Sequence, residues 1–261
     1  MLLATLSLLL TVEAHPAGVE ENRQIVRKAV QLYEKGFENN TKFFYQRRRE
    51  VSEFESGGRV KSKSSTTVRR EAYEGLVVQR VVARNDQPLS PEEQAKQQER
   101  IKTDVAAFRS RGPQTAAARK RGANEEMQLM KEFPEAFDFT RIANESVNGR
   151  PTDVYDFQPR PGYSPKSFKF KMFEKVKGRM WIDAASGEMA RVDAEAFDTI
   201  SVGFGILGKV GKGATFSMVR QEAAPGLWVM EHQRMKIEVR VMLVKSIRQE
   251  EDLRFSDYKP R

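Results

Sequence analysis

The sequence predicts an α+β protein in which an antiparallel sheet packs against helices. About nine or ten segments have the alternation or composition of β-strands, and nearly all of them are joined by short turns. Helical spacing occurs in two regions only, near the N-terminus and between residues 88 and 132. Strands that follow one another through hairpins favour an antiparallel sheet over alternating βαβ units.

The first predicted helix covers residues 19–36, VEENRQIVRKAVQLYEKG. Acidic residues stand in its first turn and Gly36 at its end, which is the arrangement that helix termini prefer. We expect an amphipathic helix that buries one face. The apolar residues at helical spacing are Ile25, Val26, Ala29, Leu32 and Tyr33.

Polar strands are predicted next. Two of them flank the Ser56-Gly57-Gly58 turn, and a third, residues 76–84, ends at Asn85-Asp86. Because the first pair is rich in charged residues, we expect one of its faces to lie in water and the charges to protect an exposed edge.

Residues 88–132 form a charged insertion. Ser90, Pro91 and Glu93 have the spacing of an N-cap, a first helical residue and a capping box. We predict a helix there, followed by a mobile stretch over 109–124. Two interpretations stay open: a helical excursion without chemistry, or a basic arm that contacts an anionic surface.

Strand patterns resume at residue 137. Asn148-Gly149 is a favoured hairpin turn, and a second hairpin spans residues 178–196. In its second strand the small or β-branched residues occupy every second position, so we expect them on one face of the sheet. We expect Trp181, in the first strand, at the edge or on the outer face. These small residues, which would leave room beside a helix or an acyl chain, are Ala190, Val192, Ala194 and Ala196.

Composition and motifs argue against most catalytic classes. The chain has a net charge of +9 and no cysteine, which excludes disulfides and thiolate chemistry. His232 is the sole histidine beyond residue 17, so we expect no zinc site and interpret His232 as structural. The glycine-rich run 203–208 lacks the strand and helix context of a dinucleotide site. We therefore expect no cofactor, no metal, no catalytic residue and no nucleic-acid partner, and we keep an exported hydrolase with paired carboxylates as a third interpretation.

The N-terminus resembles a secretory signal. Leu2–Val12 is a short apolar run followed by small residues, and no later run of about 18 apolar residues could span a membrane. We expect residues 1–17 to be a signal peptide and residues 18–261 to form a single exported, periplasmic domain.

Three pieces resemble one family. They are ESVNGRPTDVYDFQPRP (145–161), the hairpin KGRMWIDAASGEMARVDAE (177–195) and RFSDYK (254–259). With the leading helix, they resemble the periplasmic lipoprotein-sorting proteins of the LolA/LolB type, a superfamily that includes MucB/RseB-type domains. The resemblance implies a curved antiparallel sheet, an unclosed half β-barrel with helices packed in its concave mouth.

It also implies a non-enzymatic carrier that holds the acyl chain of a lipid or lipoprotein in a hydrophobic groove. The alternative is an envelope sensor or protein-interaction module on the same fold. We expect a monomer whose positive charge favours an anionic membrane surface or an envelope protein. From strand alternation, the residues predicted to line the groove are Val78, Val82, Met180, Ile182, Val192, Met235, Ile237, Val239, Val241 and Leu243.

Overall fold

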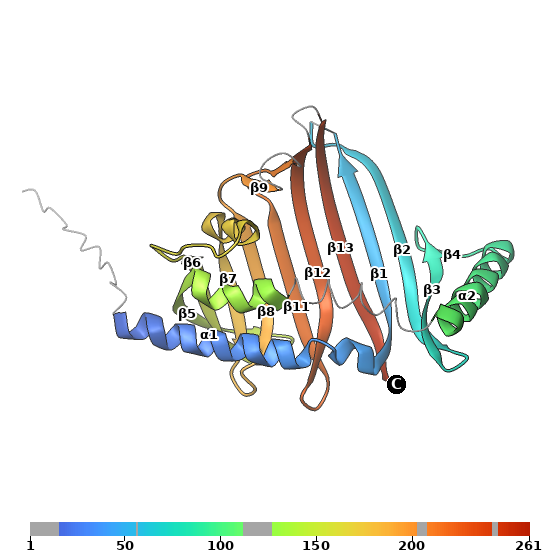
Figure 1. The fold of residues 1–261 in the computed structure, drawn as a ribbon, viewed down its shortest axis with the longest axis horizontal. Coiled ribbons are helices and arrows are strands. Elements are labelled where there is room, and N and C mark those ends of the chain that lie inside the picture. The colour runs from blue at the N-terminus through green and yellow to red at the C-terminus, as the bar shows by residue number, and fades with distance from the viewer. Residues whose placement is uncertain (1–15, 56, 112–126, 203–207, 242–244) are drawn as a thin grey trace, which may run out of the picture.

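A computed structural model of the chain describes residues 16–55, 57–111, 127–202, 208–241 and 245–261 (Figure 1). One large antiparallel sheet dominates these residues, in the strand order β4-β3-β2-β1-β13-β12-β11-β8-β7-β6-β5. The order ends in two different edge strands, so the sheet is not closed. The α+β class and the unclosed antiparallel sheet that the sequence predicts are confirmed.

Within the described residues the sheet contains thirteen strands. Two strands lie outside the order given above: β10 pairs with β12, and β9 pairs with β10. The bounds in the first half of the chain are β1 Phe43–Phe54, β2 Val60–Tyr73, β3 Leu76–Arg84, β4 Gln87–Pro88, β5 Phe137–Val147 and β6 Arg150–Pro159. Those in the second half are β7 Val176–Asp183, β8 Met189–Ala196, β9 Ile200–Val202, β10 Gly208–Val210, β11 Thr215–Ala224, β12 Leu227–Val241 and β13 Lys245–Pro260. The number exceeds the predicted nine or ten because β4, β9 and β10 are too short to show a periodic pattern.

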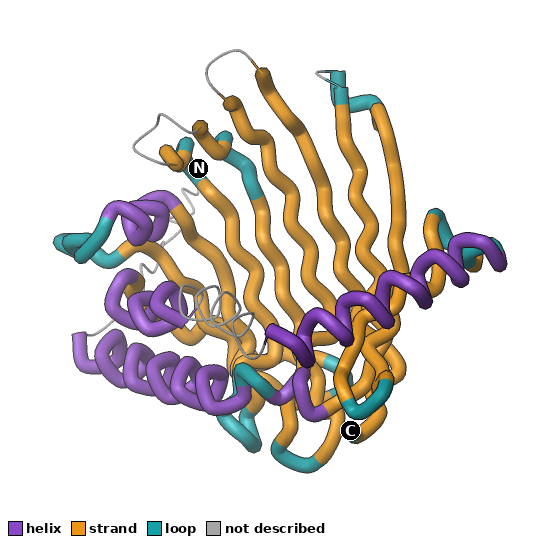
Figure 2. The backbone as a smooth tube through the Cα atoms, turned by 45° about the vertical axis from the view of Figure 1, so that its right-hand side comes forward, coloured by secondary structure: helices purple, strands orange, loops and turns teal. Residues whose placement is uncertain are grey.

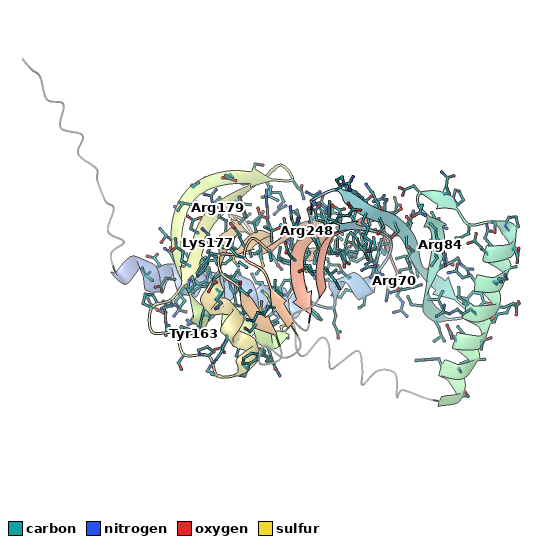
Figure 3. The ribbon with its side chains drawn as sticks, turned by 90° about the horizontal axis from the view of Figure 1, so that it is seen from above. Arg70, Arg84, Tyr163, Lys177, Arg179 and Arg248 are labelled. Atoms are coloured by element: carbon teal, nitrogen blue, oxygen red, sulfur yellow. The ribbon has the colours of Figure 1, made fainter. Side chains whose placement is uncertain are left out.

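Helices cover one face of the sheet over part of its width. Figures 1 and 2 show α1 (Pro16–Gly36), the helical residues 127–136 and the 3-10 helix η2 (Phe168–Lys175) in front of the β5 to β12 region. A short 3-10 helix η1 (Asn39–Lys42) leads from α1 into β1. Seen from above, the sheet curves and α2 (Pro91–Arg111) stands at its opposite end (Figure 3).

The buried face of α1 agrees with the predicted one at Val26, Ala29 and Tyr33, but the prediction is wrong for Ile25. Val26 and Ala29 are fully buried and Tyr33 nearly so, whereas Ile25 is 37% exposed. Asn22 donates to the backbone oxygen of Phe139 at 3.0 Å, which fixes the helix against β5.

The predicted capping box of α2 is confirmed. Ser90 donates its backbone N–H to Glu93, and Glu93 donates its backbone N–H to the Ser90 hydroxyl, at 2.9 and 3.2 Å. The helix packs on β3 through Ile101 and Val105, both buried. In the described residues, the side of β3 away from β2 pairs with only the two residues of β4, and α2 packs beside the rest of the strand.

The main core lies between the helices and the sheet. We define the inner face of the sheet as the one that carries Met180, Val192 and Met218, which pack in this core with α1, residues 127–136 and η2. A smaller cluster lies on the outer face and contains Val147, Val154, Trp181, Ala190 and Trp228.

The outer cluster corrects one face prediction. The register between β7 and β8 shifts between Trp181 and Ile182, so the strand parity changes there. Met189 consequently joins the inner core and Ala190 the outer cluster, although the sequence alternation predicts Ala190 on the same face as Val192. Trp181 lies on the outer face, as expected.

Several predicted features fall outside the described residues. They include residues 1–15 of the predicted signal peptide, residues 112–124 of the predicted mobile stretch and residues 203–207 of the glycine-rich run. Within the described ranges, no helix is long and apolar enough to cross a membrane.

Candidate functional site: a methionine-rich groove

An apolar groove lies between the helical layer and the inner face of the sheet. It encloses a cavity of about 480 Å³, which is in the range of small-molecule sites. The sheet side of its lining comes mainly from β7, β8, β11 and β12. The residues that line it are Tyr33, Leu129, Met130, Phe133, Phe137, Phe157, Met172, Phe173, Val176, Met180, Met189, Val192, Ala194, Glu195, Ala196, Ile200, Val210, Ala214, Thr215, Phe216, Met218, Met230, Gln233, Met235 and Ile237.

Methionine is concentrated in this lining. Of the ten methionines of the chain, the seven in the groove are Met130, Met172, Met180, Met189, Met218, Met230 and Met235. A methionine side chain is unbranched and polarisable, so it adapts to irregular apolar shapes. The lining can therefore accommodate apolar ligands of different shapes.

The helical wall is built on an aromatic cluster. The ring of Phe133 lies 4.8 Å from that of Phe137 and 5.0 Å from that of Phe157, measured between centroids. Phe173 of η2 joins through Phe137 at 5.4 Å. Such tilted and edge-to-face pairs add to the stabilisation by burial, so this wall is well packed.

The floor of the groove is formed partly by small residues. A Cβ atom added to Gly178 would lie 2.0 Å from the backbone oxygen of Asp193 and 2.6 Å from the ring of Phe157. Ala194 lies opposite Gly178 on β8. Glycine is thus required at position 178 because β8 and the ring of Phe157 approach it closely.

A buried ion pair lies beside the groove and contacts two of its lining residues, Tyr33 and Met189. Arg220 is 3% exposed and donates to Glu188 at 2.8 Å and to the backbone oxygen of Met189 at 3.1 Å. Its guanidinium also lies 5.0 Å from the ring centroid of Tyr33, so it joins α1 to the sheet.

Polar groups are few in the lining. Among the lining residues, Glu195 is the one charged side chain, and Thr215 and Gln233 add neutral hydrogen-bonding groups. Elsewhere in the helical layer, Glu132 is buried and accepts a hydrogen bond from the Tyr163 hydroxyl at 3.1 Å. Burial and the adjacent carboxylate raise the pKa of Tyr163, so it stays a neutral donor.

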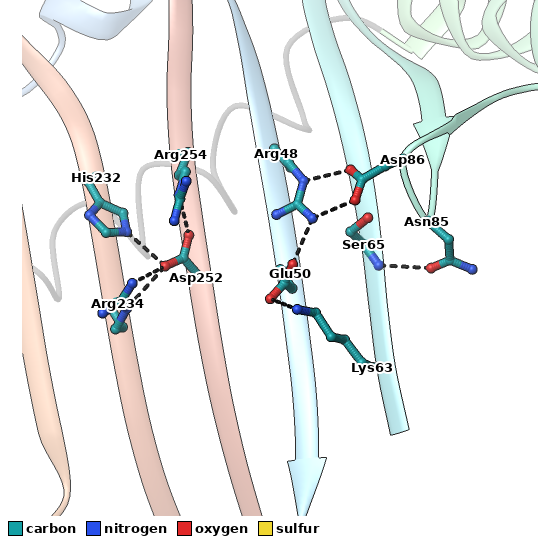
Figure 4. A network of polar contacts seen from close by, with 10 residues as sticks. All are labelled: Arg48, Glu50, Lys63, Ser65, Asn85, Asp86, His232, Arg234, Asp252 and Arg254. Carbon is teal, nitrogen blue, oxygen red and sulfur yellow. Dashed lines mark hydrogen bonds and ion pairs between the residues drawn. The ribbon is translucent and has the colours of Figure 1, made fainter. Parts of the chain in front are cut away.

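The outer face differs from the groove because it is dominated by ion pairs (Figure 4). Asp252 accepts hydrogen bonds from His232 at 2.9 Å and from Arg234 at 3.0 Å. Burial favours its neutral form, but these hydrogen bonds outweigh burial and hold the pKa of Asp252 below its ordinary value. His232 thus contacts an outer-face carboxylate. Within the described ranges, no group of three or more metal-ligating side chains occurs.

The structure brings four of the predicted groove residues together. Met180, Val192, Met235 and Ile237 line the same cavity. Ile182 is buried in the main core beside them, 4% exposed. Their role in binding a ligand stays a prediction.

The other predicted residues lie elsewhere. Val239 pairs with Val210 at the end of β12. Val78 borders a different hollow, between β3 and α2, and Val82 lies on β3 too, separated from β12 by β2, β1 and β13. Alternation alone cannot tell which strands are neighbours, so it grouped distant strands. Leu243 is outside the described residues, as is the side chain of Val241.

Sequence reasoning missed the helical wall and most of the methionines. Leu129 and Met130 belong to the segment interpreted as a charged insertion, and Phe133 follows it directly. Met172 and Phe173 belong to residues 167–178, whose sequence leaves a short helix and an irregular link open. The methionine content of residues 127–235 was the available signal, because these residues carry eight of the ten methionines.

Comparisons with known proteins identify similar structures. No family model matches the sequence. No curated protein matches it either. A DUF1329 family protein from Desulfovibrio piger is 11% identical, with 93% of this chain and 92% of that chain covered and a TM-score of 0.34.

Two further structures are similar at low sequence identity. A domain described as an outer membrane lipoprotein-sorting protein of Vibrio parahaemolyticus is 11% identical, with 90% of this chain and 93% of that chain covered and a TM-score of 0.34. A chain of the Pseudomonas aeruginosa MucA/MucB complex is 10% identical, with 90% of this chain and 99% of that chain covered and a TM-score of 0.24.

Proposed function

We propose that this protein is a non-enzymatic carrier that holds an acyl chain, from a lipid or a lipoprotein, in the methionine-rich groove. The observation that carries the proposal is the lining itself: an open apolar cavity of about 480 Å³ with seven methionines and a single charged residue. The predicted signal peptide supports export of this carrier, and we propose that it acts in the periplasm.

Burial alone can supply the affinity. Each methylene group removed from water contributes about 0.8 kcal/mol, so a chain of about twelve methylenes would gain on the order of 10 kcal/mol before the costs of association. No covalent step is needed, and a ligand held only by burial leaves again when its chain finds another apolar environment.

The first test is whether the purified protein holds lipid. Native mass spectrometry and lipid extraction of the same sample should detect co-purifying acyl lipid. A fluorescent fatty acid should bind saturably and be displaced by an unlabelled one.

A matched pair of variants tests the location. Met235 and Lys236 are neighbours on β12, but Met235 lines the groove and the Lys236 side chain is 54% exposed and ion-paired with Glu250. Met235→Gln should weaken binding of the fluorescent fatty acid about fivefold or more, because it places a polar amide against the acyl chain of the ligand. Lys236→Gln should bind as the unmodified protein does.

An apo mass with no probe binding would overturn the carrier function, and the fold would then be better explained as a protein-interaction module. Equal affinities of the two variants would show that fatty acid binds away from the groove.

A further inference from the structure

The inner face of the sheet continues past the groove onto β13, β1 and β2, whose residues are not part of the groove lining. Residues directly opposite one another on paired strands share a face, so the register extends the face across the sheet. Met235 of β12 lies opposite Glu251 of β13, and Gln233 lies opposite Leu253. Leu253 in turn lies opposite Arg49 of β1. The groove floor and Arg49 are therefore parts of one surface.

Arginines gather on this part of the inner face. Arg47 and Arg49 alternate with Arg48 along β1, so the first two point to the inner face and Arg48 to the outer face. Arg70 of β2 lies opposite Tyr45 and above its ring, 5.9 Å from the centroid. We define Arg47, Arg49 and Arg70 as the arginine bank. Figure 3 labels Arg70 toward the α2 end of the sheet.

Two of the three guanidinium charges of the bank are not balanced by acids in the described residues. Arg49 makes a bidentate pair with Glu251 at 2.7 and 2.9 Å. No ion pair joins Arg47 or Arg70 to another residue in the described ranges, and the Nε atom of Arg70 is buried without a hydrogen-bond acceptor there. By contrast, Arg48 is bound by Asp86 and Glu50 on the outer face (Figure 4).

The surroundings of the bank are apolar as well as basic. Arg47 lies between Phe255 of β13 and Val68 of β2 in the strand register. Both of these side chains are partly exposed, as are Leu253 and Val51 on the same face. A surface with unpaired guanidinium groups among apolar side chains complements an anionic amphiphile better than it complements water.

We propose, on the basis of the carrier function above, that the arginine bank binds the phosphate headgroup of an anionic phospholipid whose acyl chain occupies the groove. Guanidinium groups bind phosphate oxygens through paired, charge-assisted hydrogen bonds. Only β13 separates β1 from β12, so Arg47 and Arg49 lie about 10 Å across the sheet from β12, the nearest strand of the groove, and Arg70 on β2 lies about 14 Å from it. That span suits a lipid with its chain in the groove and its headgroup on the bank.

The test compares three amphiphiles with the same acyl chain: a lysophosphatidylglycerol, a lysophosphatidylcholine and a monoacylglycerol. Each displaces the fluorescent fatty acid from the full-length protein. The anionic phospholipid should bind about tenfold more tightly than the monoacylglycerol at low salt, because it presents a phosphate with a net negative charge to the bank and the monoacylglycerol has no phosphate. The zwitterionic lipid should fall between them, and high salt should narrow the gap.

The variants locate the effect. Arg47→Gln combined with Arg70→Gln should abolish the preference for the anionic lipid and leave the affinity for the monoacylglycerol unchanged. Arg48→Gln, the sequence neighbour on the outer face, should retain the preference. Circular dichroism of each variant checks that the sheet is intact.

The outcomes separate the two assignments. Equal binding of all three amphiphiles by the unmodified protein, or a preference that survives the double substitution, overturns the headgroup site and leaves the carrier intact. Saturable binding of inorganic phosphate, with the same affinity as the anionic phospholipid, would also overturn it, since the site would then bind a free anion rather than a lipid headgroup. No binding of any amphiphile overturns both the carrier and the headgroup site.

Discussion

The two halves of the inner face are built differently. From β6 to β12, methionine and aromatic side chains lie beneath α1, residues 127–136 and η2. From β13 to β2, the same face carries arginine, serine and glutamate beside scattered apolar residues. The hydrogen-bonded ladder of strands is continuous across both halves, so strand pairing does not depend on the apolar side chains. The helices depend on them, because they pack against the sheet through these side chains.

The ion pairs show the same difference. Arg220 and Glu188 are 3% and 10% exposed in their side chains, whereas Arg49 and Glu251 are 47% and 18% exposed. A buried pair leaves an uncompensated charge when it is broken, while an exposed one is replaced by water. The helix-covered half should therefore be the less tolerant of substitution.

The largest effect is expected from Arg220→Ala. It leaves Glu188 buried without its partner and removes the contact with Tyr33, so the free energy of unfolding should fall by about 4 kcal/mol. Urea denaturation followed by circular dichroism measures it. Arg49→Ala is the matched change in the other half and should cost less than about 1 kcal/mol. Similar losses in the two variants would contradict the contrast between the halves.

Gly178→Ala should have the next largest effect. The added Cβ atom meets backbone atoms of β8 at 2.0 and 2.9 Å, so the strands must separate and the free energy of unfolding should fall by about 3 kcal/mol. Ser64→Ala, at an exposed inner-face position of β2, should change it by no more than about 0.5 kcal/mol. A stable Gly178→Ala protein with unchanged fatty-acid binding would show that the groove floor is more adaptable than its packing indicates.

Acid should weaken the helix-covered half through Asp183. Burial would raise its pKa, but hydrogen bonds from Arg150 and Ser186 outweigh burial and hold the pKa at about 2, below the ordinary 3.8. Because the folded pKa is the lower one, this carboxylate stabilises the fold above pH 3.8, and the contribution, about 2 kcal/mol, is lost as the pH falls toward 2.

Urea denaturation of the protein and of Asp183→Asn, at pH 5 and pH 2.5, measures that loss. The variant should show less change between the two pH values. Asp104→Asn, at an exposed position on α2, is the control and should keep the full change in unfolding free energy between the two pH values. If Asp183→Asn also keeps the full change, other carboxylates are responsible for it.

The smallest effect concerns α2, which covers the polar half at β3. Ser90→Ala removes the hydroxyl that accepts from the backbone of Glu93, and it should destabilise α2 by about 1 kcal/mol. Hydrogen exchange should be faster in the first turns of α2 and unchanged in β7 and β8. Ser110→Ala, near the helix end, is the control. Faster exchange throughout the sheet would mean that α2 and the sheet unfold as one unit.

Local features were predictable because their signals are contained in short segments. The helix α1, the capping box of α2 and the Asn148-Gly149 turn each depend on residues within a few positions. Strand alternation likewise grouped Met180, Val192, Met235 and Ile237, which line one cavity, and their role in binding stays a prediction.

What the sequence could not supply is which strands are neighbours. Val78 and Val82 alternate like Met235, yet their strand lies far across the sheet. Ala190 has the parity of Val192, yet a shift in register turns it to the outer face.

The sequence by itself thus determined the α+β class, the helix and turn positions, and the alternation of charged and apolar residues along each strand, because these depend on local propensity and spacing. The tertiary structure decided the groove and the arginine bank. Both are assembled from side chains on different strands, and pairing between strands far apart in the chain sets which of those side chains meet.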